Sequence, residues 1–141
     1  MKTPNPTPEH FNEFTKEYLP GHLGIRITAI EKGSFSAEMP VTKQLMAPNG
    51  YLHAGSVVTL ADSCCGLGCV TNLPEGATGF TTIELKSNHL GTAQEGEVVE
   101  CTAKLYHGGR TTQVWDALVT HKDTGKTVAL FRCTQLILYK K

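Results

Sequence analysis

The chain has 141 residues, of which 40% are apolar, and this predicts one domain, residues 1–141, built round one hydrophobic core. Thirteen basic and thirteen acidic residues cancel, and the largest basic cluster is the terminal Lys140-Lys141 pair. The composition therefore argues against a nucleic acid or an anionic membrane surface as the partner. The start has no apolar signal segment, and no apolar run approaches the roughly 18 residues of a membrane span, so we expect a cytoplasmic protein.

The five cysteines are an odd number without CxxC spacing, which argues against a disulfide framework. Cys64, Cys65 and Cys69 lie in an apolar segment, where free thiols pack as small hydrophobic side chains. A Cys nucleophile that uses His53 and a metal site built from cysteines stay open as alternatives, although the spacings do not match thiolate ligands. We expect no metal and no cofactor.

Residues 1–20 predict an N-terminal arm and a short helix. The first eight residues are polar and rich in Pro, as in a frayed terminus. The segment 9–18 predicts an amphipathic helix with Phe11, Phe14 and Tyr18 on one side. A Pro-Gly pair then ends the helix.

Two strands are predicted next, with a turn at Gly33 between them. The segment 23–30 alternates apolar residues with smaller or polar ones, and 34–41 forms the second strand. Because the connection is short, we expect the two strands to form a hairpin.

The stretch from Tyr51 to Val70 predicts a helix with one buried charge. Between Gly55 and Val70 the only charged residue is Asp62. With 3.6 residues per turn, the apolar residues of this segment lie on all sides of the helix, which indicates that protein encloses it. An enclosed carboxylate is costly. Asp62 is therefore either satisfied by a structural partner or has a raised basicity that is used in a water-poor site.

After a turn near residue 75, four segments rich in Val, Thr, Ile and Leu predict long strands that are antiparallel neighbours: 80–90, 97–106, 112–121 and 127–139. Apolar and polar residues alternate in the second of them, so one face of the sheet is wet and the central helix covers the other. This order predicts an α+β hotdog fold, a curved antiparallel sheet of about six strands wrapped round one long helix. The edges of such an open sheet favour an oligomer.

With this order of elements, the chain resembles the hotdog-fold acyl-CoA thioesterases of the phenylacetate-degradation (PaaI) type, which include aryl-CoA thioesterases. The resemblance covers roughly residues 20–139 and rests on GYLHAGSVVTLAD, TTIELKSNHL and HGGRTTQVW followed by DTGKTVAL. In this family His-Gly-Gly opens the central helix and an Asp or Glu follows the His by nine residues, as Asp62 follows His53 here. The resemblance implies hydrolysis of an acyl-CoA substrate.

The arrangement suits thioester cleavage. The first turn of a helix exposes N–H groups with partial positive charge, so the amides of Ala54 and Gly55 are candidates to bind the thioester carbonyl and its oxyanion. Asp62 would activate water, or attack the carbonyl itself to give an anhydride. His53 is either a helix-entry residue that fixes the loop or, as the resemblance implies, a residue that orients the site without transferring protons.

The chain departs from the family pattern at two positions. Ala54 replaces the first Gly of His-Gly-Gly, which keeps the N–H but loses tolerance for positive φ. Ala47 lies six residues before His53, where the family often has a Gln or Asn that orients the water or the carbonyl. Asn49 is a candidate substitute, or an ordinary Asn-Gly turn residue.

Three further residues match positions of the family. Thr82 matches a small hydroxyl residue that faces the catalytic carboxylate, and His89 lies in a strand segment that matches the acyl pocket. Arg110 matches a basic residue near the nucleotide-binding surface, where a guanidinium can bind CoA phosphates. From the residues alone, each also fits an ordinary strand or turn position.

The length of the helix separates the two reactive groups. Asp62 lies about eight residues, on the order of 12 Å, from the amide of Ala54. Both must come within about 3 Å of one reacting centre, so the same helix cannot supply both. Two antiparallel copies can, because a two-fold axis puts Asp62 of one subunit opposite Ala54 of the other. We therefore expect a homodimer with shared active sites, and the resemblance implies that it is often doubled to a dimer of dimers.

Two other functions stay open. A hotdog hydratase or dehydratase would want an Asp and a His close together on one catalytic segment, and the nine-residue interval argues against this. A protein that binds acyl-CoA without cleaving it is compatible with the altered Ala54. We predict a thioesterase that releases CoA and a carboxylic acid from an aromatic or medium-chain acyl-CoA.

Overall fold

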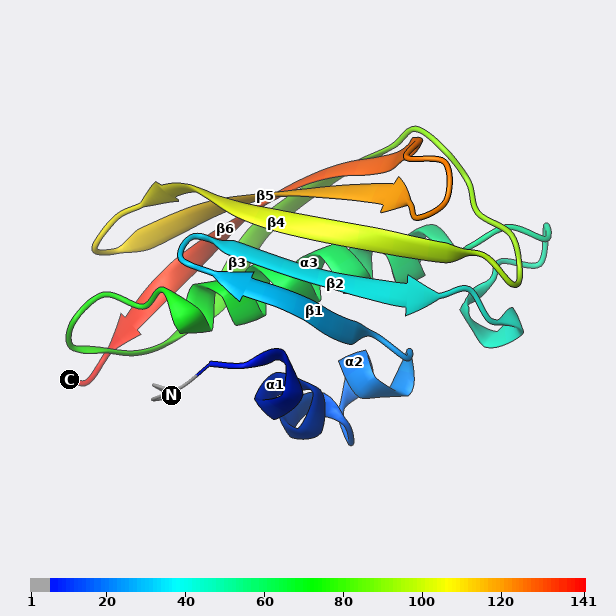
Figure 1. The fold of residues 1–141 in the computed structure, drawn as a ribbon. Coiled ribbons are helices and arrows are strands. Elements are labelled where there is room, and N and C mark those ends of the chain that lie inside the picture. The colour runs from blue at the N-terminus through cyan, green and yellow to red at the C-terminus, as the bar shows by residue number, and fades with distance from the viewer. Residues whose placement is uncertain (1–5) are drawn as a thin grey trace.

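The computed structural model describes residues 6–141, so the first five residues of the predicted arm lie outside the described range. The helices are α1 (Pro8–Thr15), α2 (Leu19–His22), the short 3₁₀ helix η1 (Lys43–Leu45) and α3 (Ala54–Thr71). The strands are β1 (Arg26–Glu31), β2 (Ser34–Pro40), β3 (Ala77–His89), β4 (Val98–Gly108), β5 (Thr112–His121) and β6 (Thr127–Tyr139). They match the predicted segments to within three residues at each end. The strands form one layer, and α1, α2 and α3 lie on one side of it (Figure 1).

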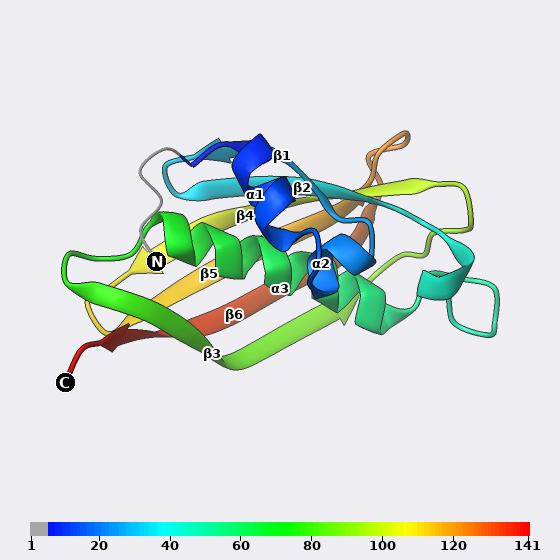
Figure 2. The ribbon, with the colours of Figure 1, turned by 90° about the horizontal axis from the view of Figure 1, so that it is seen from below.

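The six strands form one antiparallel sheet in the order β1-β2-β4-β5-β6-β3. The sheet curves round α3 (Figure 2), which confirms the α+β hotdog prediction. One part of the prediction is wrong, because β3 and β4 follow each other in sequence but are not neighbours. β4 pairs with β2, which joins the N-terminal hairpin to the sheet, and β3 pairs only with β6 and forms the far edge.

α3 packs one side against the sheet. It contacts β2, β3, β4, β5 and β6. The residues it buries are Val57, Leu60, Ala61, Cys64, Cys65, Gly68, Cys69 and Val70. The opposite side, which includes Val58, Asp62 and Leu67, is only half buried. The prediction of a helix enclosed on all sides is therefore only partly correct for one chain.

By length and composition, α3 is long and apolar enough to span a membrane. The prediction that no apolar run approaches the length of a membrane span is therefore wrong. The helix has 18 residues with a mean hydropathy of 1.3. In this structure it is the central helix of the fold, with 44% of its residues buried. Core helices of globular proteins reach the same values, because they too are apolar on most sides.

The N-terminal helix is shorter than the segment 9–18 that was predicted. α1 ends at Thr15, and the chain turns into the four-residue helix α2. Of the three aromatic residues on the predicted apolar side, only Phe11 enters the core, whereas Phe14 and Tyr18 are 51% and 66% exposed. The helical period therefore placed Phe11 correctly, but Tyr18 lies in the turn after the helix.

The packing of α3 on β5 depends on Gly68. A Cβ at Gly68 would lie 2.8 Å from ring carbons of Trp115, which is fully buried and has no room to move. We expect Gly68→Ala to lower the free energy of unfolding by about 1–3 kcal/mol, as overpacked cores do, in spite of the higher helix propensity of Ala. Urea unfolding measures this. Gly66→Ala is the matched control, since its Cβ would meet only the end of the half-buried Phe80 ring, at 3.1 Å; equal losses in the two variants would contradict the account.

Candidate active site

His53 forms the entry to α3. It is the N-cap residue, with extended backbone at φ −65° and ψ 137°, and its Nδ1 accepts a hydrogen bond from the N–H of Gly55 at 2.8 Å. When Nδ1 is the acceptor, a neutral imidazole carries its hydrogen on Nε2. His53 therefore fixes the start of the helix and keeps an Nε2–H donor on an exposed ring.

The two predicted oxyanion donors differ in availability. The N–H of Gly55 is occupied by His53, so the expectation that both amides face the substrate does not hold in this structure. Ala54 is exposed, and its N–H makes no hydrogen bond within residues 6–141. No residue other than Gly has a positive φ in this range, so Ala is unstrained at the first helical position. The Ala54 amide, at the positive end of the helix dipole, is the available donor.

Asn49 lies in the tight turn that leads to His53. Its Oδ1 accepts from the N–H of Tyr51 at 3.1 Å, and the next residue, Gly50, has a φ of 91°. This is the Asn-Gly turn role considered for Asn49. Its side-chain amide donors take part in no hydrogen bond within the described residues. Asn49 is therefore a turn residue that keeps two donors beside the helix entry.

Four of the predicted site residues line one cavity at this end of α3. The cavity has a volume of about 350 Å³, and the four residues are Asn49, His53, Ala54 and His89. His89 reaches it as the last residue of β3. The structure thus brings together a helix-end amide, two imidazoles and a side-chain amide from two segments that are separate in sequence.

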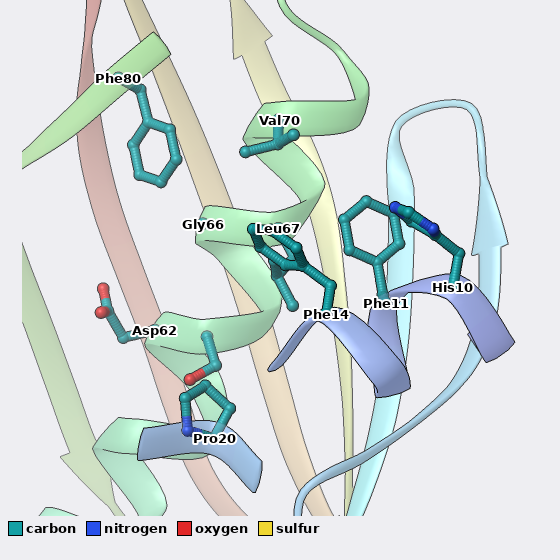
Figure 3. A pocket seen from close by; sticks show the side chains of 10 residues that line it. His10, Phe11, Phe14, Pro20, Asp62, Gly66, Leu67, Val70 and Phe80 are labelled. Atoms are coloured by element: carbon teal, nitrogen blue, oxygen red, sulfur yellow. The ribbon is translucent and has the colours of Figure 1, made fainter. Parts of the chain in front are cut away.

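Asp62 lies elsewhere, in a second cavity of about 530 Å³ along the half-buried side of α3. Figure 3 shows its carboxylate beside the helix, on the side from which Phe80 of β3 approaches. Its Oδ1 is buried without a hydrogen-bond partner in the described part of the chain, and no ion pair there includes it. Burial raises the pKa of the Asp62 carboxyl above its ordinary value.

Thr82 and Arg110 are not brought to either cavity. The Oγ1 of Thr82 donates to Oε1 of the buried Gln135 at 2.6 Å, so its hydroxyl is used within the sheet. The guanidinium of Arg110 lies 5.3 Å from the centre of the Tyr139 ring, whose hydroxyl donates to the Arg110 carbonyl. The β4–β5 turn that carries Arg110 lies at the end of the sheet opposite to the start of α3 (Figure 1).

The Asp62 cavity contains residues to which the sequence analysis gave no role in the site. On α3 these include Gly66 and Leu67, and the N-terminal helices contribute Phe11, Phe14 and Pro20. Gly66 follows Asp62 by one helical turn, so helical periodicity alone would have placed it beside the carboxylate. Nothing in the local sequence indicates that α1 folds back to this cavity.

The cysteines are packing residues. All five are buried and free of disulfides. Contact with Cys101 and burial raise the pKa of the Cys64 thiol, contact with Cys133 and burial do the same for Cys65, and burial raises the pKa of Cys69 to about 12. Such thiols stay protonated and are poor nucleophiles. Within the described residues, no group of three or more His, Cys, Asp or Glu side chains could hold a metal ion.

Comparison with known proteins gives a consistent picture. The Thioesterase superfamily model matches residues 49–128. The 1,4-dihydroxy-2-naphthoyl-CoA hydrolase of Listeria monocytogenes is 34% identical over 119 residues, which cover 84% of this chain and 94% of that protein. Among solved structures, the thioesterase PA1618 of Pseudomonas aeruginosa has a TM-score of 0.88 at 32% identity and covers 95% of both chains. The PaaI protein of Escherichia coli has a TM-score of 0.81 at 25% identity, over 93% of this chain and 91% of that one.

The fold agrees with these similarities. The family model spans more than half of the chain, and the Listeria relative is similar over nearly its whole length. This chain therefore belongs to the Thioesterase superfamily and is a hotdog-fold hydrolase of acyl-CoA thioesters.

Proposed function

We propose that the chain hydrolyses an aromatic or medium-chain acyl-CoA to CoA and a carboxylic acid, with Asp62 as base or nucleophile. The observation that carries the proposal is the Asp62 carboxylate, half buried, without a partner in the described residues and at the wall of an apolar cavity. Burial raises its pKa and so its strength as a base. The relative from Listeria is named for an aromatic acyl group, which supports an aromatic substrate.

The proposed site is shared between two subunits. Asp62 and the Ala54 amide are on the order of 12 Å apart along α3 and line separate cavities. β3 is an edge strand whose Ile83 and Leu85 are 56% and 45% exposed, as suits a strand that a second copy covers. A two-fold axis beside β3 would make the two α3 helices antiparallel and set Asp62 of one subunit opposite Ala54 of the other. The same axis would place the end of the sheet that carries Arg110 in one subunit near the start of α3 in the other subunit.

In the proposed reaction, the Asp62 carboxylate takes a proton from water while the water oxygen attacks the thioester carbonyl carbon. The carbonyl electrons move onto oxygen, where the Ala54 N–H and the helix dipole stabilise the negative charge. When the intermediate collapses, the C–S bond breaks and the proton on Asp62 passes to the CoA thiolate. Direct attack by Asp62 gives the same products through an anhydride, which water then cleaves.

The neighbouring donors have a positioning role in this proposal. The Nε2–H of His53 and the side-chain amide of Asn49 line the same cavity as Ala54, and His89 closes it from β3. They would hold the thioester oxygen and the adjoining part of CoA in reach of the amide. A hydratase that needs an Asp and a His close together on one segment is not supported, since His53 and Asp62 of the same chain line different cavities.

Assembly beyond the dimer and the cellular location are part of the proposal. The outer face of the sheet exposes Leu118 and Leu130, which are paired on β5 and β6 beside the charged Asp116 and Arg132, and a dimer of dimers would cover part of this face. The five buried thiols without a disulfide suit a reducing compartment, which supports the cytoplasm. The direct test of the activity is CoA release from a panel of acyl-CoA thioesters, detected as free thiol; a protein that binds them without release is a carrier and not an enzyme.

The carboxylate is tested with Asp62→Asn. We expect turnover to fall by about 100-fold or more, because the isosteric amide is no base. At a pH above the raised pKa, Asp62 is ionised in both the folded and the unfolded chain, and burial penalises only the folded one, so the variant should have the higher Tm there. The difference in Tm between variant and wild type should shrink as the pH falls from the raised pKa of folded Asp62 to its ordinary pKa in the unfolded chain. The kcat/KM of the wild type should fall over the same pH range, because the protonated carboxyl is no base. A folded Asp62→Asn variant with full activity would refute the catalytic role.

The amide is tested with two variants of Ala54. Ala54→Pro removes the N–H and should lower kcat by roughly 100-fold or more, yet Pro fits the first position of a helix. Ala54→Gly keeps the N–H and should stay within a few-fold of wild type. Circular dichroism checks the fold of both. Equal losses in the two variants would indicate that another group binds the oxyanion.

The shared site is tested with a hybrid dimer of one Asp62→Asn and one Ala54→Pro subunit. One of its two sites combines both intact residues and the other both defects, so about half of the wild-type activity should return. The measurement is CoA release by heterodimers that are co-expressed with two tags and purified through both. Hybrids that are stable dimers but no more active than their parents would show that each chain holds a complete site.

A further inference from the structure

The Asp62 cavity has a wall on each side of the exposed face of α3 (Figure 3). One wall is Phe80 of β3, whose ring ends close to Gly66, one turn after Asp62. The other is α1, whose Phe14 lines the cavity together with Leu67 of α3. The Thioesterase superfamily match begins only at residue 49, so this second wall comes from a segment outside the matched part of the chain.

α1 is clamped to the sheet by one side chain. Asn12 uses both ends of its amide on Ile27 of β1: Nδ2 donates to the carbonyl at 3.1 Å, and Oδ1 accepts from the N–H at 2.8 Å. Next to it, Phe11 is buried against Phe35, with ring centroids 5.8 Å apart. Because these contacts fix both the place and the rotation of an eight-residue helix, they also fix the direction of Phe14.

Phe14 contributes little to the core. It is 51% exposed, whereas Phe11 is 2% exposed. Its ring is stacked on His10 at 6.3 Å and meets Phe11 edge-on at 6.4 Å. These rings give the cavity an aromatic surface, of the kind that suits contact with an apolar ligand.

The cavity is long enough for more than a small acyl group. Gly66 and Val70 follow Asp62 by about one and two turns, so the cavity extends roughly 12 Å from the position of Asp62 along α3. Its lining is apolar apart from Asp62, Ser63 and His10. Gly66 has no side chain, so the end of the Phe80 ring packs close to α3 there, and a Cβ at Gly66 would lie 3.1 Å from it.

We infer that the acyl group lies in this cavity against Phe14, so that α1 makes the enzyme select acyl groups large enough to reach it over acetyl. Phe14 is then a specificity residue. Asn12 is a positioning residue, since it holds α1 and does not line the cavity. The inference rests on the proposed function, because it needs the thioester carbonyl beside Asp62.

The test compares acetyl-, octanoyl- and naphthoyl-CoA as substrates. We expect Phe14→Ala to lower kcat/KM for octanoyl- and naphthoyl-CoA by about 10-fold or more and to leave acetyl-CoA unchanged. Gly66→Ala brings a methyl group to 3.1 Å from Phe80 and should act chiefly on naphthoyl-CoA. Glu13→Ala is the matched control, because Glu13 is an exposed residue of α1 that does not line the cavity, and all three substrates should keep their wild-type values.

The positioning role is tested by combining variants. Asn12→Ala should reduce the preference for large acyl groups as Phe14→Ala does. If Asn12 acts only through Phe14, the double variant loses no more selectivity than the more affected single variant. Additive losses, or an Asn12→Ala variant that is folded and keeps wild-type selectivity, would overturn the positioning role.

The outcomes separate this inference from the proposed function. If the wild type releases CoA and Phe14→Ala keeps its ratio of kcat/KM between octanoyl- and acetyl-CoA, the inference is wrong and the proposed function stands. If the wild type releases CoA from none of the thioesters, the proposed function is wrong, and binding of the thioether analogue of octanoyl-CoA decides the inference. If the wild type and Phe14→Ala then bind that analogue with equal affinity, the inference about Phe14 is wrong.

Discussion

The fixed rise of an α-helix is the constraint on which the proposed site depends. α3 carries the only unpaired amide at its start and a partnerless carboxylate two turns later, within the part of the chain that the structure describes. Five strands hold the helix along its buried side, so it can neither bend nor slide to bring the two groups together. Their separation is therefore a permanent property of the fold, and symmetry is the simple way to overcome it.

Asp62 stands out because similar groups in the core are satisfied. The buried Gln113 donates to the carbonyl of Asn72 and accepts from the indole of Trp115, and the buried Gln135 accepts from Thr82. Only three buried side-chain atoms in the described residues lack a partner: Asp62 Oδ1, Ser87 Oγ and His121 Nδ1. Of these, the carboxylate costs the most when it is ionised, which is why its position at a cavity points to chemistry and not to packing.

The sequence predicted what local pattern encodes and missed what depends on long-range contact. Hydrophobic periodicity gave α3 and the strands, and the nine-residue interval gave His53 and Asp62. The sequence did not reveal that β3 pairs with β6 and not with β4, since the pairing of strands distant in sequence leaves no local pattern. The sequence did offer His53 as a helix-entry residue that fixes the loop, but not that it occupies the amide of Gly55, because the partner of a cap depends on the rotamer of one side chain.

The fold of α1 against Ile27 and the placing of Arg110 at the far end of the sheet were equally beyond reach. The first depends on how the N-terminal segment packs on β1, and the second on the direction in which β4 runs beside β2. Residues outside the central motif can therefore shape the site without any motif of their own.

The Asn12 clamp also governs how large an assembly the sheet can make. A sheet with two available edges can add copies at both and grow without limit, as fibres do. Here α1 lies along β1, and the amide of Asn12 takes both backbone groups of Ile27 that another strand would need. β3 is then the edge at which one further sheet can be added. If two chains pair through β3, each outer edge is a clamped β1, so edge-to-edge growth would end there and a dimer of dimers would have to form through the outer face of the sheet.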